Sequence, residues 1–371
     1  MSNTPYNMKQ HDEFLFECEL SGLDYDLAKS FFEGLTLEDL LFGCTSFAKN
    51  GLYGRSYDLT YDDSTTLLIR VNDAKYKNIG IGGYKFTQET CLDIINGVNN
   101  HEDLVKIAPF FTFEGINEAG LVYNINILPS NDLESYSIAE VETKEKLSSF
   151  MLGRFILDNF GSAKEAIEYV RDYCDIYPLG PLAVHFMISD PEGKTYILEF
   201  VDGKLSIIES NILANFYMTG AKFNDDGTIA TSTTAEGNVT KIANVTPHAQ
   251  GLERYNIVVE NYDKLETIED FFDTLHKIRF TNLYRDETDP VWYSDLSDYA
   301  EITVDTPLSE LDELLETVKK YAINPKREAI FNEEGKLCSC EQSVNQSVYD
   351  IENRILYVET QEQDGPHKFS I

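Results

Sequence analysis

Residues 42–59 read FGCTSFAKNGLYGRSYDL, and this stretch decides the fold expected of the chain. Short apolar runs on either side of Asn50-Gly51 predict two strands and a tight turn, because Asn-Gly is a preferred pair in two-residue hairpin turns. Such a hairpin brings Arg55, on the returning strand, back beside the start of the first strand, where Cys44 lies. The sequence therefore predicts a cysteine and an arginine close together at one end of a hairpin.

A cysteine acts as a nucleophile in its thiolate form, and a nearby cation such as Arg55 favours that form. It also needs a base, and no histidine lies near Cys44 in the sequence. If the Gly43–Cys44 bond is cut, the free α-amino group of Cys44 can serve as that base. Glycine suits such a cut because it lacks a Cβ that would shield the carbonyl. The alternative interpretation of Cys44 is a small buried hydrophobe in a strand.

Four further stretches extend this pattern. GRSYD at 54–58 resembles a Gly-Arg-Asn-x-Asp element, with serine in place of asparagine, and EGINEAGL at 114–121 resembles Asp-Gly-Met-Asn-Glu-x-Gly-Leu. ANFYMTG at 214–220 and GLERYN at 251–256 add an asparagine and an arginine. Together these motifs resemble the N-terminal-nucleophile (Ntn) hydrolase family that includes choloylglycine hydrolase, penicillin V acylase, acid-ceramidase-like amidases and penicillin acyltransferases. SVYDIENRILYV at 347–358 is similar to the final hairpin of that family.

The resemblance implies six catalytic residues: Cys44, Arg55, Asp58, Asn117, Asn215 and Arg254. Cys44 would supply the thiolate and, through its own amine, the general base. Asp58 would hold that amine, and Arg55 would stabilise the thiolate. An ion pair of purely structural importance is the alternative for Arg55 and Asp58.

The same resemblance implies that Asn117 and Asn215 offer amide N–H groups to the tetrahedral oxyanion, where one donor is typically worth roughly 10²–10³ in rate. Arg254 would order the other polar side chains. Asn117 has an alternative interpretation as a turn residue, because Asn-Glu-Ala-Gly is good turn chemistry. Asn215 and Arg254 rest on short matches, and both are open to a structural interpretation.

Strands come in blocks and helices in pairs, which favours an α+β protein with antiparallel sheets and segregated helices. The helical pairs are expected at 144–174 and 251–279, and the resemblance implies a four-layer αββα sandwich, the Ntn hydrolase fold. Residues 14–43 also look helical, because apolar residues recur every three or four positions. We therefore expect an N-terminal pro-segment at 1–43, removed or retained after cleavage at Gly43-Cys44, and a catalytic domain at 44–371.

The chain has 371 residues, and 64 acidic against 30 basic side chains give a net charge of −34 at pH 7. This charge argues against nucleic acid as a partner, because acidic side chains repel the phosphate backbone. No stretch approaches 18 apolar residues, so no membrane span is expected. The N-terminus lacks the features of a secretory signal, so a cytoplasmic location is expected. A homo-oligomer is compatible with the sequence.

Six cysteines are too few and too scattered for a disulfide scaffold; they are Cys18, Cys44, Cys91, Cys174, Cys338 and Cys340. Cys338 and Cys340 lack the further ligands that a structural zinc site needs. They lie in the irregular region 285–345, which has one expected helix at 308–321. His185 lies in an apolar strand and is interpreted as a core histidine.

The expected function is hydrolysis of a linear, non-peptide amide by N-terminal Cys44, through a thioester and after autocatalytic processing. The partner is a small N-acyl amide such as a conjugated bile salt, penicillin V or an N-acyl amino acid, and the implied mechanism needs no cofactor. Two alternatives stay open. The same fold can pass the acyl group to an amine, as an acyltransferase, or the protein can be a dormant precursor or non-catalytic binding protein.

Overall fold

The two predicted strands at 42–59 form a hairpin at the centre of the molecule. Strands β3 (Phe42–Lys49) and β4 (Leu52–Leu59) pair antiparallel, with Ser46 opposite Arg55. Asn50 and Gly51 both have positive φ, 53° and 76°, as the predicted two-residue turn requires. Because side chains alternate along a strand, Cys44 and Arg55 project from the same face of this hairpin.

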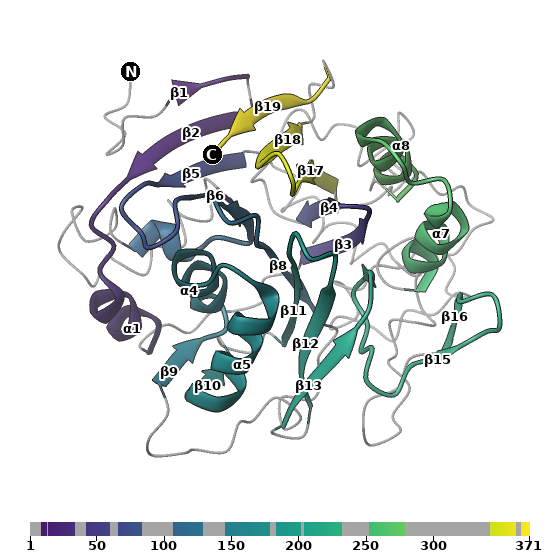
Figure 1. The fold of residues 1–371 in the computed structure, drawn as a ribbon, viewed down its shortest axis with the longest axis horizontal. Helices are drawn as coiled ribbons and strands as arrows, with labels where there is room; N and C mark the ends of the chain where they lie inside the picture. The colour runs from purple at the N-terminus through teal and green to yellow at the C-terminus, as the bar shows by residue number, and fades with distance from the viewer. Residues whose placement is uncertain are drawn as a thin grey trace, which may run out of the picture.

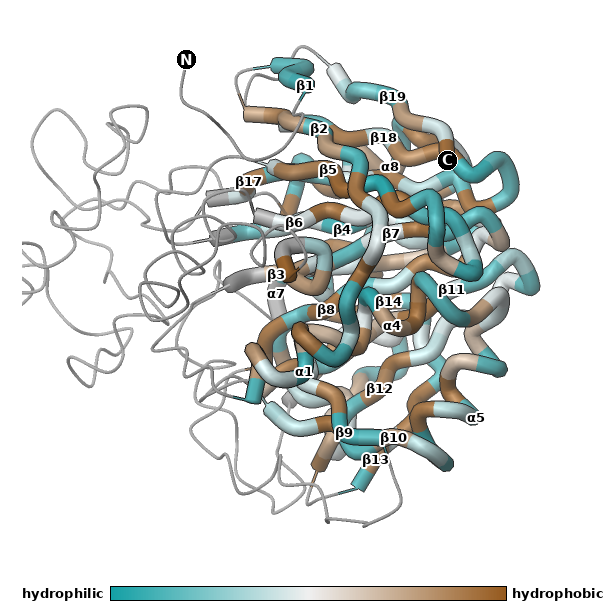
Figure 2. Tube along the Cα trace, turned by 90° about the vertical axis from the view of Figure 1, so that its left-hand side faces the viewer, coloured by the Kyte–Doolittle hydropathy of each residue, from teal (hydrophilic) through white to brown (hydrophobic). Residues whose placement is uncertain are grey.

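In the computed structural model the described residues are 9–12, 14–33, 42–59, 66–83, 107–128, 145–178, 183–201, 204–231, 252–278, 342–360 and 365–371. In this part of the chain, two large sheets lie between two helical layers (Figure 1). Figure 2 shows hydrophobic segments along many of the strands, such as β2, β5, β8 and β12. The predicted four-layer αββα sandwich is confirmed.

The larger sheet has nine strands, and its neighbours pair antiparallel except for β2 and β5, which are parallel. In sheet order the strands are β1 (Lys9–Gln10), β2 (Leu15–Leu20), β5 (Thr66–Val71), β6 (Asn78–Gly83), β7 (Glu114–Asn117), β8 (Val122–Ile127), β11 (Val184–Ser189), β12 (Thr195–Val201) and β13 (Lys204–Glu209). Along β8, Tyr123 and Ile125 join the apolar cluster under the helices, whereas Asn124 reaches Tyr53 of the other sheet. Polar side chains of β8 therefore enter the space between the sheets.

The smaller sheet has six strands, all antiparallel to their neighbours. In sheet order they are β14 (Ile212–Leu213), β3, β4, β17 (Gln342–Asp350), β18 (Ile355–Glu359) and β19 (His367–Ser370). Strands β17 and β18 form the hairpin that the sequence predicts near the C-terminus. Two short pairs complete the strands: β9 (Glu145–Ser148) with β10 (Cys174–Tyr177), and β15 (Lys222–Phe223) with β16 (Ile229–Thr231).

The helices form where the sequence predicts two pairs. Helices α4 (Met151–Asn159) and α5 (Ala163–Tyr173) lie on the larger sheet, with η2 (Ala108–Phe110) nearby, and α7 (Leu252–Tyr262) and α8 (Ile268–Ile278) lie on the smaller one (Figure 1). The break between α4 and α5 follows from Ser162, whose side chain accepts a hydrogen bond from the backbone N–H of Glu165 and so caps α5. None of the helices in the described ranges is long and apolar enough to cross a membrane.

The N-terminal segment differs from the prediction. Leu15–Leu20 forms strand β2 instead of a helix, whereas α1 (Tyr25–Glu33) is helical as expected. Short apolar runs fit either structure, and pairing with β5 settles the choice because it satisfies the backbone and buries Leu15. The predicted helical character of residues 34–41 lies outside the described residues, as do the helix at 308–321 and the pair Cys338/Cys340.

Candidate active site

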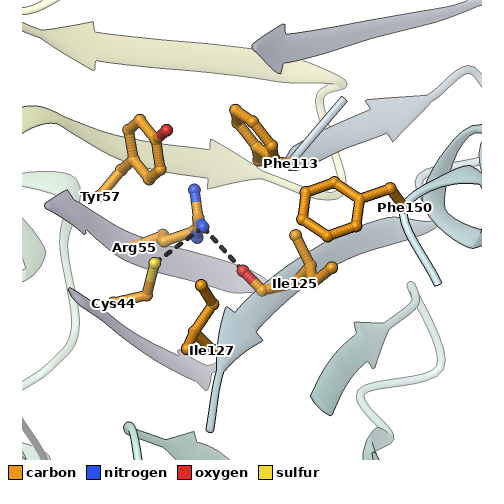
Figure 3. A pocket seen from close by; sticks show the side chains of 7 residues that line it. All are labelled: Cys44, Arg55, Tyr57, Phe113, Ile125, Ile127 and Phe150. Carbon is orange, nitrogen blue, oxygen red and sulfur yellow. Dashed lines mark hydrogen bonds between the residues drawn. The ribbon is translucent and has the colours of Figure 1, made fainter. Parts of the chain in front are cut away.

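The sulfur of Cys44 lies between the two sheets, in contact with a buried cation. Arg55 Nη2 donates to Cys44 Sγ at 3.1 Å and to the backbone oxygen of Ile125 at 2.8 Å (Figure 3). Both side chains are about 1% exposed. The predicted convergence of Cys44 and Arg55 is confirmed, and the carbonyl of β8 fixes the guanidinium beside the sulfur.

A buried carboxylate holds Arg55 from its other side. Arg55 Nη1 donates to Glu114 Oε1 at 2.8 Å, and both side chains are almost fully buried. Glu114 Oε2 accepts from Ser347 Oγ at 2.5 Å and from Tyr349 Oη at 2.8 Å, both on β17. Glu114 of the larger sheet thus joins Arg55 on β4 to two residues of the neighbouring strand β17, and it links the two sheets. Glu114 has no separate signal in the sequence beyond its place in EGINEAGL.

The environment of the thiol keeps it protonated in the uncut chain. Burial raises the pKa of Cys44 to about 11, while Arg55 acts in the opposite direction. Burial lowers the pKa of Arg55, but the neighbouring Cys44 and Glu114 outweigh it and raise that pKa overall. Forming the thiolate therefore requires a base close to Cys44 as well as the cation.

Asn215 lies at the backbone nitrogen of the same cysteine. Cys44 N donates to Asn215 Oδ1 at 2.8 Å, and Asn215 Nδ2 donates to the backbone oxygen of Ile127 at 2.6 Å. Strand β14 brings Asn215 here, because its residue Leu213 pairs with Ser46 of β3. Asn215 is thus brought to Cys44, but its amide oxygen faces the backbone nitrogen and its N–H group donates to β8, so its role as an oxyanion donor stays a prediction.

Asp58 and Arg254 form an ion pair on the opposite face of the hairpin. Arg254 Nη1 of α7 lies 2.5 Å from Asp58 Oδ2. Asp58 Oδ1 accepts from Ser56 Oγ at 3.0 Å and from Ser343 Oγ at 2.5 Å. Asp58 is also the cross-strand partner of Gly43. The pair therefore lies next to the Gly43–Cys44 bond, and Ser56 supplies one of its hydrogen bonds.

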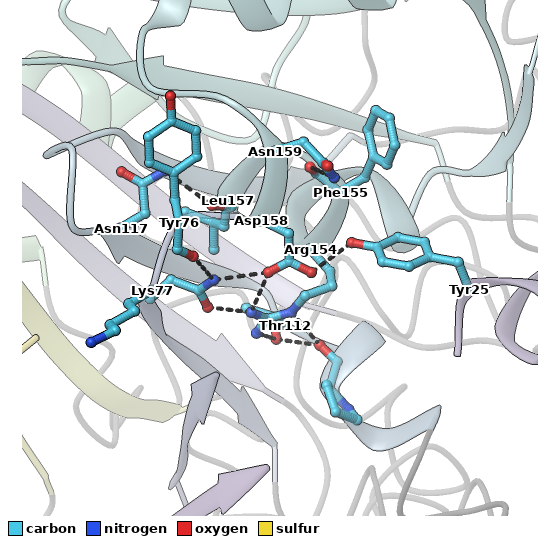
Figure 4. A network of polar contacts seen from close by, with 12 residues as sticks. Tyr25, Tyr76, Lys77, Thr112, Asn117, Arg154, Phe155, Leu157, Asp158 and Asn159 are labelled. Atoms are coloured by element: carbon cyan, nitrogen blue, oxygen red, sulfur yellow. Dashed lines mark hydrogen bonds and ion pairs between the residues drawn. The ribbon is translucent and has the colours of Figure 1, made fainter. Parts of the chain in front are cut away.

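Asn117 is not brought to Cys44, which corrects the expectation of an oxyanion donor. Its Nδ2 donates to the backbone oxygens of Leu157 at 3.0 Å and Phe160 at 2.7 Å (Figure 4). Its Oδ1 accepts from the backbone N–H groups of Ala119 and Leu121. Asn117 thus joins the β7–β8 turn to the end of α4, which is the turn interpretation that the sequence left open.

Asn126 of β8 occupies the position that Asn117 was expected to take. Its Nδ2 lies 3.5 Å from the backbone oxygen of Cys44, and its Oδ1 accepts from Asn124 Nδ2 at 2.6 Å. Asn124 Oδ1 in turn accepts from Tyr53 Oη. These contacts direct the N–H group of Asn126 toward Cys44. The signal in the sequence was the alternation in VYNINI, which puts two asparagines on one face of a strand.

A small pocket opens beside the sulfur (Figure 3). Its empty volume is about 230 Å³, and apart from Cys44 and Arg55 the described residues that line it are apolar or aromatic: Tyr57, Phe113, Ile125, Ile127 and Phe150. Tyr57 and Phe113 stack with ring centroids 5.4 Å apart. A pocket of this kind suits an apolar group bound next to the sulfur. Among the described residues, no group of three or more His, Cys, Asp or Glu side chains could hold a metal ion.

Two curated proteins are similar to part of this chain. The bile salt hydrolase/transferase of Clostridium perfringens (strain 13 / Type A) is 26% identical over 180 residues, covering 46% of this chain and 51% of that protein. The penicillin V acylase of Pectobacterium atrosepticum is 26% identical over 165 residues, covering 42% of each chain. The matched region thus spans about half or less of the length of these relatives.

Comparison with a solved structure concerns the fold alone, because the sequences share little identity. A mutant of the conjugated bile acid hydrolase from Clostridium perfringens superposes with a TM-score of 0.52 at 17% identity, covering 88% of this chain and 92% of that one. The family described as acyl-coenzyme A:6-aminopenicillanic acid acyl-transferase matches residues 108–301, just over half of the 371 residues. Because this match covers more than half of the chain, the chain belongs to this acyl-transferase family.

Proposed function

We propose that this protein is an Ntn amidohydrolase that cleaves a linear, non-peptide amide with Cys44 as its nucleophile. The observation that carries the proposal is that hydrogen bonds hold both the sulfur and the backbone nitrogen of Cys44. Cys44 Sγ accepts from Arg55 Nη2 at 3.1 Å, and Cys44 N donates to Asn215 Oδ1 at 2.8 Å. An N-terminal nucleophile requires such an arrangement, since its sulfur attacks while its own amine carries the proton.

The active form would arise by cleavage of the Gly43–Cys44 bond. Cys44 Sγ attacks the carbonyl carbon of Gly43, and its proton passes to the departing nitrogen as the C–N bond breaks. Water then hydrolyses the resulting thioester, which gives a Gly43 carboxylate and a free thiol. Both residues lie in β3, and Asp58 is the cross-strand partner of Gly43, which supports a role for Asp58 in holding the new amine.

In turnover the amine of Cys44 would take the thiol proton as Sγ attacks the amide carbonyl of the substrate. Asn126 would donate to the oxyanion, because its N–H group is directed to Cys44. The amine product leaves with the proton, and water hydrolyses the acyl thioester to release the acid. Arg55 favours the thiolate, and the Asp58–Arg254 pair keeps the surrounding polar groups in place.

The substrate we propose is an N-acyl compound whose acyl part is apolar. The aromatic and aliphatic lining beside Cys44 supports this, and so do the substrates in the names of the two relatives, a bile salt and penicillin V. Conjugated bile salts, penicillin V and N-acyl amino acids are therefore the compounds to assay first.

We also propose that residues 1–43 stay bound after the cut. Strand β2 pairs with β5 over six residues, and six apolar side chains in the described part of the segment are buried: Phe14, Leu15, Cys18, Leu20, Ala28 and Phe32. Burying a large apolar side chain is worth about 1.5–3 kcal/mol, so dissociation would expose a costly surface. The processed protein would then consist of two chains, 1–43 and 44–371.

Mass spectrometry tests the proposal directly. Denatured wild-type protein should contain a chain that begins at Cys44, native spectra should show it together with the N-terminal chain, and the protein should hydrolyse at least one N-acyl amide. Cys44→Ala should abolish both processing and turnover, whereas Cys18→Ala, which removes a buried thiol outside the site, should leave both intact. An intact chain that is active would refute the proposal.

Acyl transfer to an amine is the second candidate. The names of the family and of the Clostridium relative, an acyl-transferase and a hydrolase/transferase, favour it. Both reactions pass through the same Cys44 thioester and differ in whether water or an amine attacks it. Product analysis with an added amine acceptor distinguishes them: a new amide indicates transfer, and only free acid indicates hydrolysis. Intact protein that neither cuts itself nor reacts with an acylating probe would instead indicate a dormant or non-catalytic protein.

A further inference from the structure

A second pair of buried titratable groups lies on the larger sheet and has no part in the proposed reaction. His185 of β11 and Glu199 of β12 are both fully buried, and His185 Nδ1 lies 3.0 Å from Glu199 Oε1. The sequence interpretation of His185 as a core histidine accounts for its burial. It does not account for a carboxylate placed beside it, because burying such a group is costly unless its hydrogen bonds are satisfied.

The remaining hydrogen bonds of Glu199 go to the segment that follows Asn215. The backbone N–H of Met218 donates to Glu199 Oε1 at 2.7 Å, and that of Thr219 donates to Oε2 at 2.8 Å. Together with His185 Nδ1, three nitrogen atoms therefore lie within hydrogen-bond distance of the carboxylate. Met218 and Thr219 are three and four residues beyond Asn215, so Glu199 anchors the chain close to the amide that contacts Cys44 N.

The segment that carries Asn215 is thus fixed at both ends. On one side, β14 pairs with β3 through Ile212 and Leu213. On the other side, the only side-chain acceptor that the described residues give to Met218 N and Thr219 N is Glu199. Asn215 itself bridges Cys44 N and the oxygen of Ile127. A displacement at Met218 would therefore be passed to Asn215 with little backbone between them to absorb it.

His185 connects the pair to the other asparagine of the site. In the register of β8 and β11, His185 is directly opposite Asn126, and Met187 is opposite Asn124. Directly opposed residues have side chains about 5 Å apart on the same face. His185 therefore lies beside the amide that is directed to Cys44, while its Nδ1 is bound to the carboxylate that anchors Met218.

We propose that Glu199 and His185 are positioning residues, which set Asn215 and Asn126 against the nitrogen and carbonyl of Cys44. The inference rests on the proposed function. Neither residue touches the reacting atoms. Glu199 acts through the backbone of Met218 and Thr219, and His185 acts through Glu199 and the packing against Asn126.

Glu199→Gln is the first test, because it keeps the size of the side chain but replaces one acceptor oxygen with an NH₂ group. We expect kcat to fall about 10²-fold with little change in KM, since a shift of about 1 Å at a reacting group costs about that much. Asn215 Oδ1 stabilises the protonated amine of Cys44, and its displacement in Glu199→Gln removes that contact. The acid limb of kcat/KM, which reports the base of the free enzyme, should therefore move to lower pH.

Asp158→Asn is the matched control. Asp158 is also a buried carboxylate, but its partners are Tyr25, Asn78 and Arg154, away from Cys44. Asp158→Asn should lower the free energy of unfolding and leave the acid limb of kcat/KM and the kcat of the folded enzyme unchanged.

Two variants of His185 provide a second test if Glu199→Gln fails to fold. His185→Asn retains a hydrogen-bonding group near the Nδ1 position, and its kcat should stay within about tenfold of wild type. His185→Leu has no such group, and its kcat should fall as in Glu199→Gln.

One readout does not depend on activity. In a Cys44→Ala background, which stays uncut, amide hydrogen exchange at residue 44 should be faster with Glu199→Gln, because the acceptor Asn215 Oδ1 is displaced. If wild-type protein neither cuts nor hydrolyses, the proposed function fails and this exchange still decides the positioning role. If wild type is active, the inference is overturned by a Glu199→Gln variant with wild-type kcat, an unmoved acid limb and unchanged exchange at residue 44.

Discussion

Arg55 and Arg154 are both fully buried and both paired with a carboxylate, yet their surroundings differ in kind. Arg154 of α4 donates to Asp158 at 3.2 Å, to Thr112 Oγ1 at 2.7 Å and to the oxygen of Pro109 at 3.0 Å (Figure 4). All of these acceptors are ordinary polar oxygens. Arg55 instead gives one donor to the sulfur of Cys44, beside a pocket.

The comparison shows that a buried ion pair alone does not indicate a functional site. Burying two charges is costly, and the cost is offset only when hydrogen bonds satisfy them, as they do around Arg154. In the Arg55 group, one donor is directed at the sulfur of Cys44, the nucleophile that we propose, which gains most from a cation as a thiolate. The acceptor atom and the adjacent pocket therefore favour a catalytic role for Arg55 and a structural role for Arg154.

Replacing each arginine by methionine should separate the two groups most strongly. Arg55→Met should lower kcat about 10³-fold, because the thiolate loses its cation, in addition to any loss of stability. Arg154→Met should leave kcat of the folded enzyme near wild type and lower the free energy of unfolding by about 3–5 kcal/mol, because Asp158 remains as a buried charge without its partner. Amide hydrolysis and urea unfolding measure the two effects. Equal losses of kcat in both variants would contradict the distinction.

Glu114 and Asp158 allow a finer comparison between the same groups. Glu114→Gln keeps the shape of the side chain beside Arg55 but removes a negative charge that raises the pKa of Cys44, normally about 11 in this environment. The pKa of Cys44 should therefore fall, and a fall of one unit makes alkylation by iodoacetamide at pH 8 about tenfold faster. The pH dependence of alkylation, measured in uncut protein, gives the pKa. Asp158→Asn should leave it unchanged, and a rise after Glu114→Gln would be the wrong sign.

The two groups also show what the sequence could predict. The hairpin at 42–59 contains its own turn, strands and reactive residues, so Cys44 and Arg55 were predicted from local pattern and from the resemblance. The environment of Arg154 depends on Asn78, which is 76 residues away in the sequence. That of Glu114 depends on Arg55, which is 59 residues away and lies in the other sheet. No local pattern contains that information.

The errors have the same origin. Asn117 and Asn126 are nine residues apart on neighbouring strands, and only the pairing of the sheets decides which one reaches Cys44. Leu15–Leu20 has an apolar pattern that fits a helix or a strand, and its pairing with β5 decides between them. In both cases the missing information was the location of a partner distant in sequence.

The smallest expected effect comes from Tyr25, which joins the N-terminal segment to the Arg154 group. Its hydroxyl donates to Asp158 Oδ2 at 2.6 Å, and burial together with Asp158 raises its pKa well above 10. The folded protein therefore holds this proton more tightly than the unfolded chain, so the contribution to stability is complete below about pH 10 and is lost as the pH rises further. Tyr25→Phe should cost about 1 kcal/mol at pH 7 and make the loss of stability above pH 10 shallower. Urea unfolding of the Cys44→Ala chain, with and without Tyr25→Phe, at pH 7, 10 and 11 measures both effects. Because phenylalanine cannot ionise, the free energy of unfolding should fall less steeply above pH 10 in the variant. The same steepness with and without the substitution would show that Tyr25 is not held by Asp158.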